Sequence, residues 1–167
     1  MTLLNSCRIY LQQGYDLVSG LDTVQYTSPH ATCFGGTVGG HIRHCLDHFE
    51  CLVEGLPGGK VDYDARERGV PSELDPETAG LRIQRMINLL LLGEGTIDEG
   101  QEILVKSDCG GNETHWKKST VGRELQFLVS HMVHHFAIIG IMCQSMGTEL
   151  PADFGLAPST IRHQLAS

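Results

Sequence analysis

GGHIRHCLDHFECL, residues 39–52, is the stretch that decides the fold, because it joins a helical apolar pattern to three histidines. Its apolar side chains recur at helical spacing and continue just past the stretch: Ile42, Leu46, Phe49, Val53 and Leu56. A helical residue turns by about 100° around the axis, so these side chains form one stripe. His41, His44 and His48 share a face beside that stripe. The segment predicts an amphipathic helix with imidazoles at the margin of the core.

The same helix carries a charged strip opposite its apolar stripe: Arg43, Asp47, Glu50 and Glu54. We expect this strip to face solvent, as such strips usually do. Thr37 is placed to cap the helix, and Pro57-Gly58-Gly59 is expected to end it near Leu56.

A second histidine-rich stretch, LVSHMVHHFAIIGIM, spans residues 128–142. His131 and His135 are one turn apart, which lets two imidazoles reach one ion at roughly 2.0–2.1 Å. His134 points farther from the apolar face of this helix and is a weaker candidate for a metal ligand. A single histidine on an apolar face is usually a hydrogen-bonded core residue, and this alternative remains open for His41, His48 and His134. Two clusters on separate helices favour a shared metal site, because several buried neutral imidazoles are otherwise hard to satisfy.

The rest of the chain predicts an all-α protein, a four-helix bundle in one domain over residues 1–167. Further helices are expected over residues 3–21, from the Asp75 cap to Gly93, and from near Thr120 to about Met146. Residues 102–107 and 113–119 flank Asp108-Cys109-Gly110-Gly111-Asn112, which predicts a small β-hairpin insertion between the third and fourth helices. Residues 26–40 and 61–75 are expected to be loops, and the tail after Gly147 to pack along the bundle.

Composition excludes some classes of partner. The formal net charge of −8, without a basic cluster, argues against nucleic acid as the main partner. We expect no membrane span, because the apolar run at residues 87–92 is far below the roughly 20 residues required. The N-terminus has no secretion signal, which predicts a cytoplasmic protein with free thiols. Cys45 attracts attention because it adjoins His44.

The chain resembles the DinB/YfiT-like superfamily of small bacterial four-helix-bundle metalloproteins. TVGGHIRHCLDHF, residues 37–49, is similar to the superfamily's second-helix segment, in which an acidic residue follows a histidine by three positions. His131 and His135 match its HxxxH motif on the last long helix, and the order of elements also agrees.

The resemblance implies that three histidines bind a divalent metal, usually zinc or nickel, with water completing the shell. The matching ligands are His44, His131 and His135, with His41 and His48 as alternatives on the same helix as His44. The polar residues that usually follow the last ligand are replaced here by Phe136-Ala137-Ile138, which puts the usual outer contacts in doubt.

The superfamily resemblance also implies metal-dependent thiol transferase or hydrolase chemistry, with a small-molecule substrate and a low-molecular-weight thiol such as bacillithiol or mycothiol. Asp47 and Glu124 are candidates to orient a ligand or act as a base, although each also fits an ordinary surface or helix-terminal carboxylate. Arg66 and Arg68 are candidates for the substrate rim, where they would attract an anion. The alternatives are a non-catalytic metal-binding or stress-response module, and a metal-free histidine-rich bundle that acts by dimerisation. A homodimer is compatible with the apolar content.

Overall fold

Four long helices dominate the computed structural model, which describes residues 2–65, 70–108, 110 and 115–165. They are α1 (Leu3–Gly20), α3 (Val38–Gly55), α4 (Pro76–Leu92) and α5 (Val121–Ser145). Thr37, Asp75 and Thr120 cap α3, α4 and α5, each accepting a backbone N–H from three residues along the chain. The four predicted helices are therefore confirmed, with their starts where the caps indicate.

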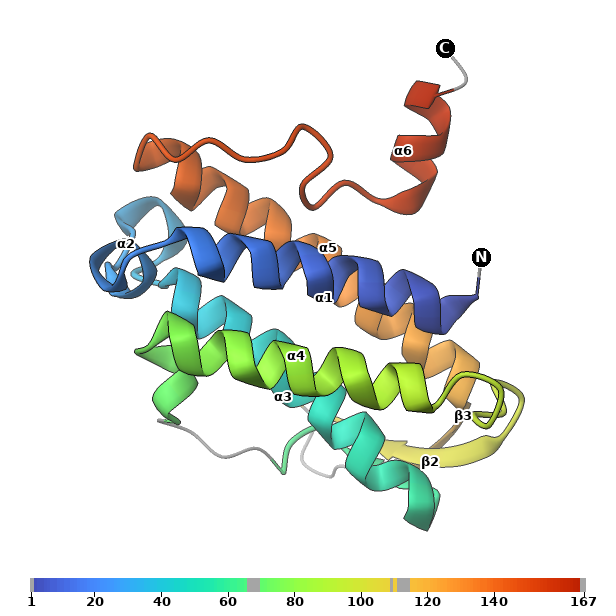
Figure 1. Cartoon of the computed structure of the whole chain (residues 1–167). Coiled ribbons are helices and arrows are strands. Elements are labelled where there is room, and N and C mark those ends of the chain that lie inside the picture. The colour runs from blue at the N-terminus through green and yellow to red at the C-terminus, as the bar shows by residue number, and fades with distance from the viewer. Residues whose placement is uncertain (1, 66–69, 109, 111–114, 166–167) are drawn as a thin grey trace.

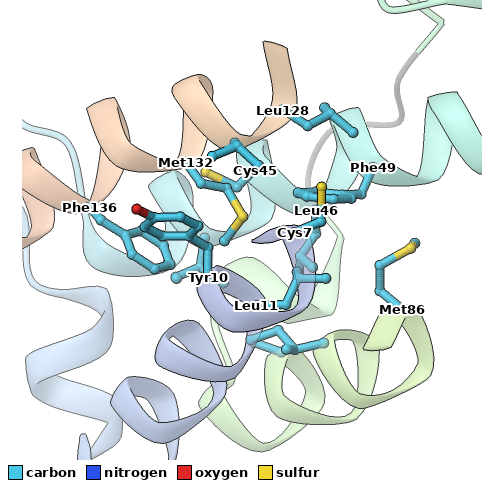
Figure 2. Close-up of a cluster of buried hydrophobic side chains, with 14 of the residues drawn as sticks. Cys7, Tyr10, Leu11, Cys45, Leu46, Phe49, Met86, Leu128, Met132 and Phe136 are labelled. Atoms are coloured by element: carbon cyan, nitrogen blue, oxygen red, sulfur yellow. The ribbon is translucent and has the colours of Figure 1, made fainter. Parts of the chain in front are cut away.

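The four helices form a bundle around one apolar core. α1 packs against α4 and α5, and α3 packs against the same two helices (Figure 1). Side chains from all four meet at the centre, and Figure 2 shows Cys7 and Leu11 of α1 beside Leu46 of α3, Met86 of α4 and Leu128 of α5. The two histidine-rich helices, α3 and α5, are consequently neighbours.

A small sheet lies at one end of the bundle. It consists of β1 (Lys60–Asp62), β2 (Glu102–Lys106) and β3 (Lys117–Thr120) in that order. β2 and β3 pair antiparallel, which confirms the predicted hairpin, and β1 adds to β2 in parallel. The expectation that residues 61–75 are only a loop is wrong at β1, and also at the 3₁₀ turn η3 (Pro71–Glu73).

Several short elements were not predicted. α2 (Thr23–Thr27) begins with a capping box in which Asp22 and Gln25 bond each other's backbone N–H. Two further 3₁₀ turns are η1 (Ala31–Cys33) and η2 (Leu56–Gly58), and the tail contains α6 (Pro158–Leu165).

The tail packs along the bundle as expected. The rings of Phe154 and Phe136 are stacked with centroids 4.9 Å apart. The Tyr10 hydroxyl donates to the Leu156 carbonyl oxygen at 2.5 Å. Figure 1 shows this segment running back over α1 and α5 before α6.

α5 alone, within the described residues, is long and apolar enough to cross a membrane by length and composition. The expectation of no membrane span was based on the shorter run at residues 87–92, which lies in α4, and it stays a prediction. A core helix meets the same criterion, and α5 packs against α1 and α3 with Leu128, Met132 and Phe136 buried. Its composition is explained by its place in the bundle.

Candidate metal centre

α3 and α5 bring their histidines together in an antiparallel ladder. The His48 ring lies 4.3 Å from that of His131, measured between centroids. The His44 ring is 4.9 Å from His131 and 4.8 Å from His135. His41, one turn earlier on α3, pairs with His135 at 5.0 Å. Since α3 advances while α5 returns, five imidazoles form one continuous cluster between the two helices.

Three of these histidines form the tightest group of candidate ligand atoms. One ring nitrogen from each of His44, His48 and His131 lies within 4.8 Å of the other two. His48 is buried, and His44 and His131 are half-buried. A three-histidine cluster, supplied by two helices, is thus present in the described structure.

The orientation of His48 is fixed by a backbone contact. Its Nδ1 lies 2.8 Å from the carbonyl oxygen of His44. A carbonyl only accepts hydrogen bonds, so Nδ1–H is the donor and Nε2 of the neutral ring keeps its lone pair. Metal-binding histidines commonly use one nitrogen in this way while the other binds the ion.

His135, the third ligand implied by the resemblance, lies one helical turn farther along the cluster, beside His41. Its ring is 4.6 Å from that of His131, but its Nδ1 lies 2.7 Å from Nδ1 of His41. Burial and then the neighbouring imidazoles lower the pKa of His135 to about 3, so its ring is neutral near pH 7. Burial, followed by the neighbouring His134, also lowers the pKa of His41. The set His44, His131 and His135 stays a prediction beside the tighter group that includes His48.

The other histidines lie outside this ladder. His134 is exposed on α5, with its ring 5.1 Å from that of His135. His115 and His163 are exposed. His30 is half-buried, and its Nδ1 lies 3.2 Å from the Ser145 hydroxyl.

A buried tyrosine connects the cluster to a carboxylate. The Tyr63 ring, just after β1, stacks on His48 with centroids 5.4 Å apart and planes inclined by 24°. Its hydroxyl donates to Glu124 Oε2 at 2.9 Å, and Ser119 Oγ donates to Glu124 Oε1 at 2.5 Å. Burial and the Glu124 carboxylate raise the pKa of Tyr63, which keeps the phenol protonated. Glu124 therefore reaches the histidines through Tyr63, a residue that the sequence reasoning did not select.

Asp47 lies on a different face of α3. The expectation that its strip faces solvent is wrong here, because Asp47 is only 6% exposed. Its Oδ2 accepts from Arg43 at 2.7 Å and its Oδ1 from Arg82 of α4 at 3.2 Å. Arg82 also bonds Glu50 at 2.5 Å. The strip therefore forms an ion-pair network toward α4, whereas Glu54 is exposed as expected.

The remaining residues singled out in the sequence are the arginines proposed for the substrate rim and the cysteine beside His44. Arg66 and Arg68 lie outside the described residues, so their role at a substrate rim stays a prediction. Cys45 is buried, and burial raises the pKa of its thiol, which disfavours the reactive thiolate. The described cysteines are free thiols, as expected: Cys7, Cys33, Cys45, Cys51 and Cys143.

Comparison with known proteins gives one sequence relative and one structural relative of note. No protein-family model matches the chain. It is 35% identical over 111 residues to a protein of the fungus Rhizopus delemar described as FK506-binding protein 5. That match covers 62% of this chain, which spans only 27% of the length of the fungal protein.

The crystal structure of a DinB-like protein from Bacillus subtilis is similar to nearly the whole chain. The alignment covers 89% of this chain and 95% of the other, with a TM-score of 0.62 and 16% sequence identity. At this low identity, the similarity shows a shared architecture and no more. The chain therefore has the DinB-like fold, and its resemblance to the DinB-like superfamily is confirmed at the level of that fold.

Proposed function

We propose that the protein binds a divalent metal ion, Zn²⁺ or Ni²⁺, through histidines of α3 and α5, and uses it in thiol transfer or hydrolysis. The observation that carries the proposal is the group formed by His44, His48 and His131, whose ligand atoms lie within 4.8 Å of one another. Imidazole nitrogen suits zinc and nickel. Three protein ligands on a four-coordinate ion leave one open position, which is typical of catalytic sites.

The spacing of this group suits an ion after a small inward movement. Tetrahedral nitrogen ligands at 2.0–2.1 Å from an ion are about 3.3 Å apart. The separation of up to 4.8 Å therefore has to shrink by roughly 1.5 Å at its widest. Changes in side-chain torsion angles supply shifts of this size. The Nδ1–H bond of His48 to the His44 carbonyl already directs the opposite nitrogen of that ring away from the backbone.

Tyr63 and Glu124 support one imidazole of the group, that of His48. A bound divalent ion acts as a Lewis acid and lowers the pKa of a thiol or water near it. The Tyr63 ring covers one side of the His48 ring. The hydrogen bond from the Tyr63 hydroxyl to Glu124 fixes the position of the Tyr63 ring. His44 and His131 are half-buried, and Nε2 of His131 is a buried atom.

A non-catalytic metal-binding module is the second candidate, favoured by the position of a pocket on another face of α3. This pocket, of about 530 Å³, is lined by Asp47, Glu50 and Arg82 on the side of α3 that faces α4. A molecule bound in this pocket would lie on a different face of α3 from the histidines.

Metal analysis of untagged protein tests binding. The wild type is expected to retain Zn²⁺ or Ni²⁺ after gel filtration, whereas His44→Gln and His131→Gln, each changed in both candidate ligand sets, are expected to lose it. His163→Gln removes an exposed histidine of α6 and serves as the matched control. Absence of metal from the wild type, even after loading with either ion, would contradict the proposal.

A thiol-consumption assay then tests catalysis. Metal-loaded wild type and His163→Gln are expected to accelerate reaction of a low-molecular-weight thiol with an electrophile, and His44→Gln is expected not to. If the wild type holds metal and shows no acceleration over buffer, the non-catalytic module is the better account.

A further inference from the structure

The cluster contains a second convergence of nitrogen atoms that the three-histidine group leaves out. Nδ1 of His41 and Nδ1 of His135 are 2.7 Å apart, although one belongs to α3 and the other to α5. His41 precedes His44 by three residues and His135 follows His131 by four, so this pair lies about one helical turn, roughly 5 Å, along the ladder. It is separate from the nitrogens that group His44, His48 and His131.

The separation of 2.7 Å places both Nδ1 atoms of the pair between α3 and α5. The loop after α2 lies against the other side of the His41 ring, since a Cβ atom on Gly36 would be 3.1 Å from His41 Nε2. His134 adds an exposed imidazole whose ring is 5.1 Å from that of His135. Both rings of the pair are half-buried, so water can complete a coordination shell.

We propose that His41 and His135 form a second site for a divalent transition-metal ion, beside the ion held by His44, His48 and His131. The proposal rests on the proposed function for the first ion. Without metal, one Nδ1–H donates to the other Nδ1. With metal, the donor ring changes tautomer and carries its proton on Nε2, so both Nδ1 lone pairs point at the ion and the nitrogens separate from 2.7 Å to about 3.3 Å.

The two sites differ in strength. The first has three protein ligands and a buried member, His48, whereas the second has two ligands, with His134 as the nearest third. Two dications about one helical turn apart also repel each other. The second ion therefore binds after the first and more weakly, and an anion lying between the ions strengthens it.

Zinc stoichiometry tests this inference directly. Untagged protein is titrated with Zn²⁺ by calorimetry, and bound zinc per chain is measured after equilibrium dialysis at a free concentration above both transitions. Wild type and His163→Gln are expected to bind two ions in two transitions. His41→Gln is expected to bind one, in the tighter transition only. His135→Gln is also expected to bind one ion. It replaces His41→Gln in the test if circular dichroism shows that His41→Gln does not fold.

The outcomes separate this inference from the function on which it rests. Two ions in the wild type and one in His41→Gln support a second site. One ion in the wild type overturns the second site, whether or not His41→Gln changes it, and leaves metal binding intact. Two ions in both proteins place the extra ion elsewhere and also overturn it. No bound zinc in the wild type overturns both proposals.

Discussion

Each histidine of the cluster is distinguished by what its Nδ1 contacts. In His48 this atom donates to a backbone carbonyl, which leaves Nε2 for a ligand. In His135 it lies 2.7 Å from another imidazole, that of His41. Residues of the same type, one or two turns apart, are therefore assigned different roles by their immediate contacts.

This difference predicts unequal effects of two single substitutions. His48→Gln is expected to weaken the tighter zinc-binding transition by more than the roughly 10- to 100-fold that changing an outer partner costs. His135→Gln is expected to leave that transition within a few-fold of wild type. Competition with a chromophoric chelator measures both. The reverse order, with His135→Gln the more damaging, would restore His44, His131 and His135 as the ligand set.

Asp47 is expected to act on stability and not at the metal. Asp47→Asn removes a buried negative charge that bonds both Arg43 and Arg82. We expect the free energy of unfolding to fall by about 1–3 kcal/mol, measured by urea denaturation, with zinc content unchanged. Glu54→Gln, exposed on the same helix, is the control and should change stability little. Lost zinc at unaltered stability would instead assign Asp47 to the metal centre.

At the scale of elements, the sequence predicts where a helix lies and which side chains share its faces, but not which side chains of other elements it contacts. Apolar periodicity and caps located α3 and α5, and the same periodicity placed histidines of both helices beside the core. The wheel of α3 could not show that Arg82 of α4 neutralises Asp47, because the partner lies 35 residues away. Tyr63 was missed for a similar reason, since it follows β1, a strand too short to show an alternating pattern.

The start of α3 depends on close contact with the segment before α4. A Cβ atom on Gly39 would lie 2.1 Å from the Glu73 carbonyl oxygen, so Gly39→Ala forces backbone to move. We expect it to lower the free energy of unfolding by about 1–3 kcal/mol or more. It should also weaken zinc binding, because His41 and His44 are in the following turns.

Gly140 of α5 is the matched control, because a Cβ atom there meets nothing within 4 Å. Gly140→Ala is expected to raise the free energy of unfolding by about 0.4–1 kcal/mol through the lower entropy of the unfolded chain. Urea denaturation measures both variants. Equal effects of the two substitutions would contradict the close packing at Gly39.

At the scale of the whole molecule, the cluster joins two of the four helices, so an ion bound there links α3 to α5. An ion that binds only the folded chain raises its stability by about 2.7 kcal/mol at a free concentration 100 times Kd. For a chain of this size we expect Tm to rise by about 5–10 °C. Differential scanning calorimetry with Zn²⁺ or with chelator measures the shift. His44→Gln should show little of it, and an equal shift in that variant would indicate binding elsewhere.

X-ray absorption spectroscopy at the zinc edge, on untagged protein loaded with one equivalent of Zn²⁺, tests the central claim most directly. We predict a first shell with three imidazole nitrogens at roughly 2.0–2.1 Å and the outer-shell scattering of histidine rings. The spectrum of His163→Gln should be the same, and that of His44→Gln should lose imidazole scattering. A shell of sulfur, or of oxygen without imidazole, would contradict a metal centre built between α3 and α5.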